Sequence, residues 1–340
     1  MTEVQFLIFD SSGSSLVEVE PKIESVAWRL NRAGRVKFSM GYADPKCTRS
    51  NLRPGNRVLL RFDNGLPNWG GVLDFPRKRG AGGVACTAYG AEHLLSWRVT
   101  AKSRYFDGAL PGYIFSTLIT EESADWPTGI VSGDIASGGT ERYLEYHYHD
   151  LLERIEDLQR LTGHDFYIAP NYSGGTLGFR ANWYTRRGSD KSGSVYLVEG
   201  HNVEGVPSLD EQGPVQNRII LVGEGQTWGD ERATASDQDT ASRDLYGYRE
   251  YSEVQSGVSN TATLENNAAA LLEERAYPRE RLTLTALDRE PATFADYDVG
   301  DRVTVEAFLS WPEWAYSGTV RVIGREWRPS GACRLEVETW

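Results

Sequence analysis

The sequence has 340 residues, of which 36 are Lys or Arg and 48 are Asp or Glu, so the formal net charge is −12. This length is too great for one small domain and predicts two or three domains of about 100–150 residues each. The acidic balance argues against a surface that neutralises nucleic-acid phosphates and against one that binds an anionic membrane. Thirty-five glycines and an aromatic content of 11% favour turns and β-strands.

The N-terminal residues do not resemble a secretion signal. Glu3 lies where a signal peptide needs Lys or Arg, and the apolar run after it is short. No apolar stretch approaches the ~18 residues of a membrane span, which predicts no membrane insertion by this chain. The three cysteines, Cys47, Cys86 and Cys333, are too far apart for a disulfide framework. We therefore expect a protein made in a reducing cytoplasm, with buried free thiols.

The first hundred residues carry short segments in which apolar and polar residues alternate, which is typical of strands with one buried face. Turn residues such as Asp63-Asn64-Gly65 separate these segments. Short, evenly spaced strands favour a closed or nearly closed antiparallel barrel, so residues 1–105 are predicted to form a first β-barrel. The predicted strands are 4–9, 25–30, 36–40, 57–62, 72–75 and 84–88.

Residues 106–215 mix helical and strand patterns and are predicted to form an α+β middle domain. A helix is expected from Pro111 to about residue 121. A stronger helical pattern covers residues 150–161, where Asp150 can cap the start and Gly163 can end the helix. The rest of this domain is predicted as a loop at 124–140 and strands at 142–148, 165–169, 176–181 and 194–198.

Strand patterns return at residues 217–222, so residues 216–340 are predicted to form a second β-barrel. Within it, residues 223–244 are polar, acidic and nearly free of apolar side chains, which predicts an inserted, solvated surface loop. Residues 263–277 carry a helical pattern that ends before Pro278.

The two ends of the chain resemble each other, which indicates an internal repeat. The tetrapeptide Gly55-Asn56-Arg57-Val58 recurs 245 residues later as Gly300-Asp301-Arg302-Val303, and residues 36–40 match 282–286 at 246. Turn-then-strand segments can look alike by chance, but the pairs that share an offset favour duplication. They are Pro67 with Pro312 and Trp69 with Trp314 (245 residues), and Gly71 with Gly318 and Cys86 with Cys333 (247 residues). Two related barrels are therefore expected, each with a Trp closing an equivalent end.

Four histidines are the candidate metal ligands. His147 and His149 lie two residues apart, and His164 or His201 would supply a third ligand. Alternation along a strand places the first two on one face. The simpler interpretation of that pattern is the polar face of a strand, so no metal site is predicted.

Other groups of polar residues also have ordinary explanations. The predicted helix at 150–161 carries three carboxylates opposite its apolar stripe: Glu153, Glu156 and Asp157. They could resemble the paired carboxylates of a glycoside hydrolase, but a solvated helix face is the simpler interpretation. Cys47 lies between Lys46 and Arg49, which is more typical of surface charge than of an activated thiol. The sequence contains no Gly-x-Ser-x-Gly, P-loop or Cys-x-x-Cys motif. We predict no enzyme, no catalytic residue and no cofactor.

Two similar barrels that enclose a smaller mixed domain resemble the tail hub proteins of bacteriophages, also called baseplate hub or tail-associated proteins. The likeness spans nearly the whole chain and rests on the order of its motifs. The segment 223–244 has no counterpart in that order. In chain order the motifs are Asp44-Pro45, residues 52–58, residues 69–73, the helix and strand at 151–168, Val215-x-Asn217-x-Ile219, and residues 299–303 with Ser317-Gly318.

The resemblance implies a mainly β fold in which two tail-hub-type antiparallel barrels flank the α+β domain. It also implies a structural virion protein at the phage tail tip, made in the host bacterial cytoplasm. Such hubs are homotrimers whose six barrels form a pseudo-sixfold ring. The implied partners are the distal tail protein ring, the tape measure protein and a tail fibre or spike protein, with DNA only as cargo in the channel.

Two other functions remain as alternatives. A carbohydrate- or receptor-binding tail protein would stack sugar rings on exposed tryptophans. The candidates are Trp69, Trp183, Trp228, Trp311, Trp314 and Trp327, whose simpler role is to fill cores and interfaces. A cell-wall hydrolase has only dispersed carboxylates in its favour.

Overall fold

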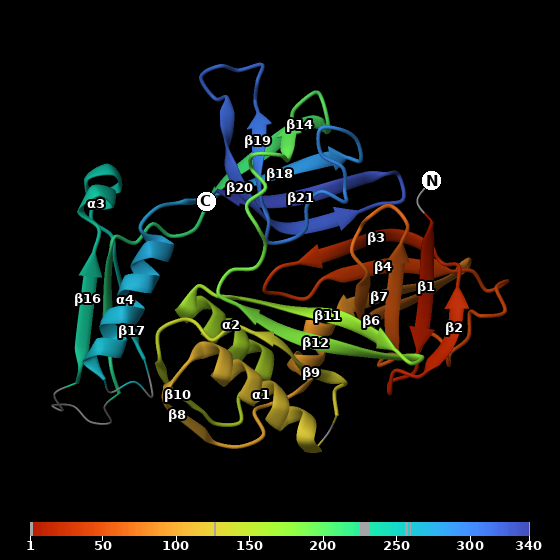
Figure 1. The fold of residues 1–340 in the computed structure, drawn as a ribbon, viewed down its shortest axis with the longest axis horizontal. Coiled ribbons are helices and arrows are strands. Elements are labelled where there is room, and N and C mark those ends of the chain that lie inside the picture. Colours follow the sequence, from red (N-terminus) through yellow and green to blue (C-terminus); the bar gives the residue numbers. More distant parts are fainter. Residues whose placement is uncertain (1–2, 126, 225–231, 256–257, 259, 340) are drawn as a thin grey trace.

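The computed structural model describes residues 3–125, 127–224, 232–255, 258 and 260–339. Thirteen strands of this part form one long sheet, and three smaller sheets accompany it. Figure 1 shows four bodies: a first barrel near the N-terminus, a middle domain, a second barrel containing the last strands, and a smaller lobe that contains α4.

The first barrel is an antiparallel sheet with strand order β3-β4-β7-β6-β5-β1-β2. Alternation predicted most of these strands, and the first and fifth have the predicted bounds. β2 was not predicted. The sheet wraps around buried side chains that include Phe6, Phe38 and Trp69. The strands are β1 (Val4–Phe9), β2 (Ser15–Val19), β3 (Lys22–Arg29), β4 (Arg35–Met40), β5 (Arg57–Phe62), β6 (Trp69–Gly80) and β7 (Gly83–Gly90), followed by the 3-10 helix η1 (Ala91–Trp97).

The second barrel repeats this order as β14-β18-β21-β20-β19-β13. The two barrels differ in the strand that pairs with β5 or β19. In the second barrel β13 pairs with β19 in parallel, whereas in the first β1 pairs with β5 antiparallel. The structure differs from the predicted boundary at residue 215, since β13 and β14 belong to this barrel and not to the middle domain. The strands are β13 (Tyr196–Val198), β14 (Val203–Gln212), β18 (Arg279–Leu287), β19 (Arg302–Ala307), β20 (Tyr316–Trp327) and β21 (Ala332–Thr339).

The predicted repeat is present in the backbone hydrogen bonds of the turn before β5 and β19. Gly55 N donates to Leu73 O (2.8 Å) and Leu73 N donates to Asn56 O (2.8 Å). In the second barrel, Gly300 N donates to Val322 O (2.7 Å), and Val322 N donates back to Asp301 O (2.9 Å). Both glycines have positive φ, 94° and 99°, which a residue with a side chain rarely adopts.

The later part of the predicted repeat has a different register. β7 and β21 each span eight residues and match at an offset of 249, not 247. Cys86 lies opposite Phe38 in the first barrel. In the second barrel, Leu335 lies opposite Leu284, the residue that matches Phe38. Cys86 therefore corresponds to Leu335 and not to Cys333.

The Trp pair is likewise not equivalent. Trp69 lies opposite Leu60, whereas Gly318 lies opposite Val305, the residue that matches Leu60. Trp69 is 2% exposed and Trp314 is 78% exposed, so only Trp69 closes a barrel. The cause is a hairpin with four more residues between the paired positions in the second barrel.

The middle domain packs two helices against a three-stranded sheet of order β11-β12-β9 and has its own apolar core. Helix α2 confirms its predicted caps: Asp150 accepts a hydrogen bond from Glu153 N (3.0 Å), and Gly163 ends the helix with φ 62°. The elements are β8 (Arg104–Ala109), α1 (Pro111–Asp125), β9 (Ile130–Ile135), β10 (Arg142–Tyr146), α2 (Leu151–Thr162), β11 (Asp165–Ser173) and β12 (Thr176–Tyr184). The segment 124–140, predicted as a loop, contains β9.

The small lobe inserts into the second barrel between β14 and β18 and has a separate core that includes Ile219, Leu221, Leu264 and Leu272. The prediction of a solvated loop at 223–244 is wrong within its described residues, because they contain β16 and most of α3. Helix α4 begins two residues earlier than predicted and ends at Arg275. The lobe consists of β15 (Arg218–Val222), β16 (Thr234–Gln238), α3 (Thr240–Tyr246), β17 (Glu250–Val254) and α4 (Thr261–Arg275).

Candidate functional site

The two barrels of one chain meet edge to edge at one pair of strands. Residues 324–327 of β20 pair antiparallel with residues 26–29 of β3, which makes the two barrels one continuous sheet. Phe62 contacts both Trp28 and Trp327, with 5.4 Å between ring centroids in each case. The junction therefore combines strand pairing with an aromatic core.

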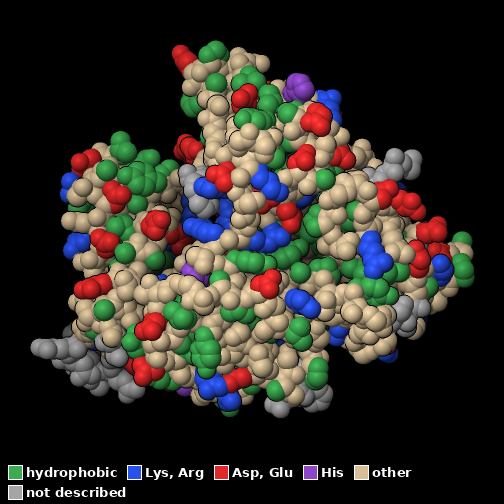
Figure 2. All heavy atoms as spheres, viewed as in Figure 1, with side chains coloured by type: hydrophobic (Ala, Val, Ile, Leu, Met, Phe, Trp, Pro, Cys, Tyr) green, Lys and Arg blue, Asp and Glu red, His purple; other side chains and the backbone are tan. Residues whose placement is uncertain are grey.

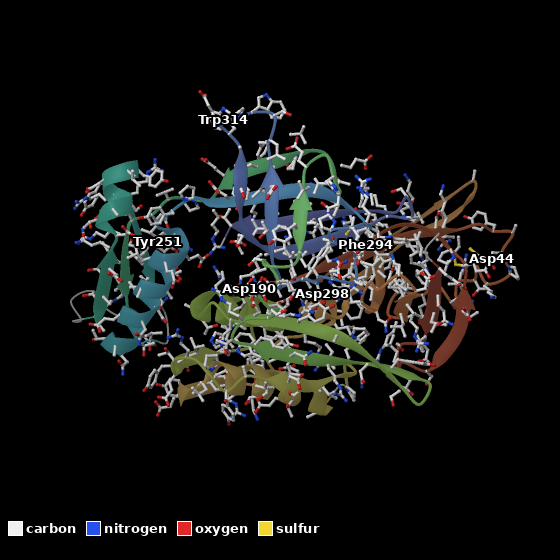
Figure 3. All side chains as sticks on the ribbon, turned by 45° about the horizontal axis from the view of Figure 1, so that its top comes forward. Asp44, Asp190, Tyr251, Phe294, Asp298 and Trp314 are labelled. Carbon is white, nitrogen blue, oxygen red and sulfur yellow. The ribbon has the colours of Figure 1, made fainter. Side chains whose placement is uncertain are left out.

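A buried arginine lies at the centre of this junction. Arg325 has no exposed surface and donates to the carbonyl oxygens of Phe294 (3.0 Å) and Tyr297, while Asp298 lies 3.7 Å from its Nη1. Figure 3 labels Phe294 and Asp298 near the place where the barrels meet. A buried charge needs partners of this kind, so the residues ahead of β19 hold β20 in place.

Ion pairs join the second barrel to the middle domain. Asp165 at the start of β11 pairs with Arg321 of β20, and both are buried. Asp165 also accepts a hydrogen bond from the backbone N–H of Arg187 (2.8 Å), whose side chain pairs with Asp298 (2.8 Å). Figure 2 shows Lys and Arg side chains gathered where the second barrel faces the middle domain.

Asp301, the turn residue of the repeat, extends this contact. Its carboxylate lies 2.8 Å from Lys191 Nζ and accepts a hydrogen bond from Ser189 N (2.8 Å). Burial raises the pKa of the Asp301 carboxyl, but the hydrogen bonds from Lys191, Ser189 and Asp298 outweigh burial and hold this pKa below its usual value. The turn that defines the repeat thus also anchors the segment after β12.

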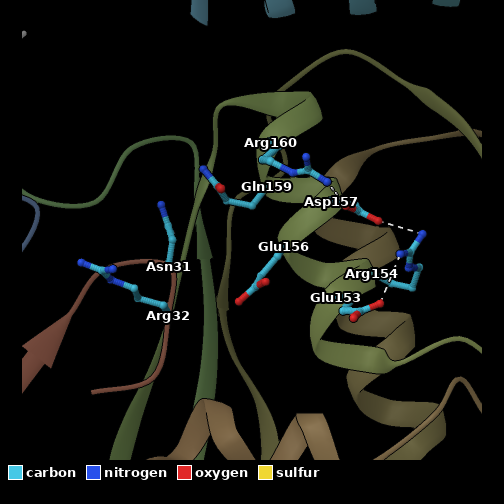
Figure 4. Close-up of a pocket in the computed structure, with 8 residues that line it drawn as sticks. All are labelled: Asn31, Arg32, Glu153, Arg154, Glu156, Asp157, Gln159 and Arg160. Atoms are coloured by element: carbon cyan, nitrogen blue, oxygen red, sulfur yellow. Dashed lines mark hydrogen bonds and ion pairs between the residues drawn. The ribbon is translucent and has the colours of Figure 1, made fainter. Parts of the chain in front are cut away.

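The carboxylates predicted to form a solvated face line an open cleft of about 510 Å³ between α2 and the β3–β4 turn (Figure 4). Arg154 lies 2.7 Å from Asp157 and 3.6 Å from Glu153, and Arg160 pairs with the same Asp157. Glu156 points toward the β3–β4 turn, and burial together with the negative charge of Asp157 raises its pKa. These are the ion pairs of a polar helix face.

The structure brings only two of the four candidate histidines together: His147 N donates to His149 Nδ1 (3.1 Å), whereas His201 is exposed in the turn after β13. His147 and His149 follow the end of β10, and His147 contacts Glu145 and Ser103, both at 2.8 Å. His164 is buried and accepts a hydrogen bond from Trp183 Nε1 (2.9 Å). Among the described residues, no group of three or more His, Cys, Asp or Glu side chains is arranged to hold a metal ion.

The cysteines are not activated. Cys47 Sγ lies 3.7 Å from Met40 O, and burial together with Asp44 raises the pKa of this thiol. Burial also raises the pKa of Cys86, to about 11. A raised thiol pKa lowers the thiolate fraction, which is the reverse of what a nucleophile needs.

The candidate tryptophans divide into two groups. Trp69, Trp183 and Trp327 are buried in the cores. Trp311 and Trp314 are 49% and 78% exposed on the hairpin after β19, and Figure 3 shows Trp314 at its projecting end. Trp228 lies outside the described residues. Within the part of the chain that the structure describes, no helix has the length and hydropathy required to span a membrane.

Comparison with known proteins identifies relatives by fold rather than by sequence. Neither a protein-family model nor a curated protein matches the sequence. Solved structures match along the whole chain. A tail protein from Neisseria meningitidis MC58 has a TM-score of 0.62 and 13% identity, covering 99% of this chain and 96% of its own.

Two prophage tail proteins match equally well. One comes from Listeria monocytogenes EGD-e (TM-score 0.61, 12% identity, 98% of this chain and 94% of its own). The other is the 43 kDa tail protein of prophage MuSo2 from Shewanella oneidensis (TM-score 0.61, 12% identity, 98% of both chains). The resemblance found in the sequence is confirmed at the level of the fold, and this chain has the fold of phage tail proteins.

Proposed function

We propose that the chain is a subunit of a phage tail-tip or baseplate hub. Three copies form a ring of six similar barrels with pseudo-sixfold symmetry. The ring joins the distal tail protein ring and the tail tube, with its tape measure protein, to a fibre or spike protein, and DNA passes through its channel. The subunit is made in the host cytoplasm and resides in the virion.

The observation that carries this proposal is the edge-to-edge junction of two barrels with the same strand order. A closed ring needs the same kind of interface at every step around it. One chain already supplies two barrels and one such interface, so three chains supply six barrels. The net charge of −12 also suits a channel for DNA, because like charge disfavours contacts with phosphates.

Light scattering after size exclusion, at several protein concentrations, tests the oligomeric state. A stable species with the mass of three 38.0 kDa chains is expected. A monomer or a dimer at every concentration would contradict the trimer.

Exposed aromatic side chains favour a second candidate function, carbohydrate or receptor binding by the hairpin after β19. Trp311 and Trp314 present flat apolar faces that can stack on sugar rings. A glycan array with the intact chain and Trp311→Ala tests this, and Trp97→Ala, with 46% of the residue exposed in another part of the molecule, is the matched control. Saturable binding lost only in Trp311→Ala would support the candidate, and absence of binding by the intact chain would exclude it.

A further inference from the structure

The internal repeat indicates where one copy of the chain contacts the next. Within one chain, β3 of the first barrel pairs with the C-terminal end of β20 of the second. The strands that match these two are β14 and the C-terminal end of β6. In the described structure each has a strand neighbour on one side only: β14 pairs with β18, and Asp74 and residues 78–80 of β6 pair with β7.

The match between β14 and β3 is shown by their partners. β3 pairs with β4, and β14 pairs with β18, which corresponds to β4 at an offset of 246. The register of both strand pairs shifts at the same place. In β3 the shift lies between Ile23 and Ser25, and in β14 it lies between Glu204 and Ser208. Beyond this irregularity, residues 26–29 of β3 correspond to residues 209–212 of β14.

The match between β6 and β20 is shown by cross-strand pairs. Lys78 pairs with Ala85 as Glu326 pairs with Arg334. One residue earlier, the two arginines make the same hydrogen bond, because Arg77 Nη1 donates to Leu52 O (2.6 Å) as Arg325 Nη1 donates to Tyr297 O. Residues 77–79 therefore correspond to 325–327. Asp74 corresponds to Gly324, because it pairs with Thr87 as Gly324 pairs with Glu336, so β6 has two extra residues at this irregularity.

We infer that residues 77–79 of one copy pair antiparallel with residues 209–211 of the next copy. This inference rests on the proposed ring of three chains and assigns the contact between its subunits. The register of the junction inside the chain, in which Arg325 lies opposite Trp28 and Glu326 opposite Ala27, transfers directly. It places Arg77 opposite Glu211, Lys78 opposite Asp210 and Arg79 opposite Leu209.

The two edges are complementary in charge. The β6 edge carries three basic residues in a row, and the β14 edge carries Asp210 and Glu211, both exposed. Opposite charges directly across a strand pair stabilise it, and like charges destabilise it. A second copy of this chain therefore suits either edge, whereas two identical edges repel each other.

The exposed apolar residues at these edges agree with a covered surface. Phe75 is 66% exposed beside the basic run, and Val206 and Leu209 are 56% and 36% exposed on β14. Arg77 is half-buried, whereas Arg325, its counterpart, is fully buried under β3. The neighbouring β14 would bury Arg77 in the same way. Because the two edges differ, the contact is head to tail, the kind of contact that forms a ring when the rotation between copies closes.

Disulfide trapping tests the register directly. Lys78→Cys and Asp210→Cys are introduced together into a chain that carries Cys47→Ser, and the protein is oxidised. Opposite residues in an antiparallel pair have Cβ atoms about 4.5–5.5 Å apart, close to disulfide geometry. Covalent dimers and trimers are expected on non-reducing gels. The matched control, Lys78→Cys with Glu204→Cys, is out of register and should remain monomeric on the gel.

Charge exchange provides the second test. Lys78→Glu alone and Asp210→Lys alone should each reduce the trimer fraction at a fixed concentration, and the double variant should restore it. Equal loss in all three variants would contradict the assigned contact.

The outcomes separate this contact from the proposed hub function. A trimer by light scattering that gives no cross-link and ignores the charge changes would overturn the contact and leave the hub in place. A monomer without cross-links would overturn both. Cross-linked open chains longer than three would support the edge contact and contradict a ring of three.

Discussion

Glu92 is a buried carboxyl group at the boundary between the first barrel and the middle domain. It is 3% exposed in η1, and Oε1 accepts a hydrogen bond from Ile168 N of β11 (3.0 Å). Burial raises its pKa to about 7, against weaker effects of backbone hydrogen bonds and Arg187 that lower it. The Glu92 carboxyl group at the contact between the two domains therefore changes its charge near neutral pH.

The sign of the resulting pH dependence follows from this pKa. An exposed glutamate has a pKa of about 4.3, so the folded protein holds the Glu92 proton more tightly than the unfolded chain does. Binding of this proton therefore stabilises the folded protein fully below about pH 4, and this stabilisation is lost as the pH rises through 7. We expect Glu92→Gln to approach the stability of the intact chain at pH 5 and to exceed it at pH 8.

Chemical denaturation at a series of pH values measures this difference in the free energy of unfolding. Glu153→Gln makes the same substitution on the exposed face of α2 and is the control for the chemical change itself. A Glu92→Gln difference that is independent of pH would contradict the account.

At the scale of elements, the repeated turn before β5 and β19 has the same backbone shape but different surroundings. A Cβ atom on Gly55 would meet nothing within 4 Å, whereas one on Gly300 would lie 2.7 Å from Arg187 O. The first turn is an open barrel end, and the second is packed against the segment after β12.

Alanine substitutions at the two glycines separate backbone strain from crowding. Gly55→Ala should cost about 1 kcal/mol or somewhat more, because alanine does not tolerate the positive φ. Gly300→Ala should cost clearly more, since the Arg187 carbonyl must also move. The free energies of unfolding of the two variants, measured under one condition, check this order, and equal losses would contradict it.

Helix caps and the alternation of apolar and polar residues predicted those helices and strands whose own side chains carry such a pattern. Asp150 and Gly163 marked both ends of α2, and alternation gave β1 and β5. The pattern failed for β16, because only Ala235 among its five residues is buried, so the strand has no run of alternating apolar residues. The core of the lobe to which β16 belongs consists of residues from separate parts of the chain, which a local pattern cannot show.

The candidate site was predictable only in part. Repeated sequence at residues 55–58 and 300–303 indicated two barrels, but not how they meet. Strand pairing between β20 and β3 uses backbone groups almost 300 residues apart and imposes no distinctive side-chain sequence. The wrong equivalence of Trp69 and Trp314 has a related cause, because the longer second hairpin moves its Trp out of the barrel.

At the scale of the whole molecule, the chain is two matching barrels joined at one pair of edges, with complementary edges left at the other ends. The middle domain and the lobe attach to this double barrel without covering either free edge in the described structure. Repetition of the internal junction between copies gives six barrels and six similar junctions. We propose that three copies of the chain form such a ring.

Electron cryomicroscopy of the purified chain tests this claim most directly. Class averages viewed along the symmetry axis should show a closed ring with threefold symmetry and six similar barrel densities around one channel. Closed rings of another copy number, open chains, or isolated single chains would contradict the account.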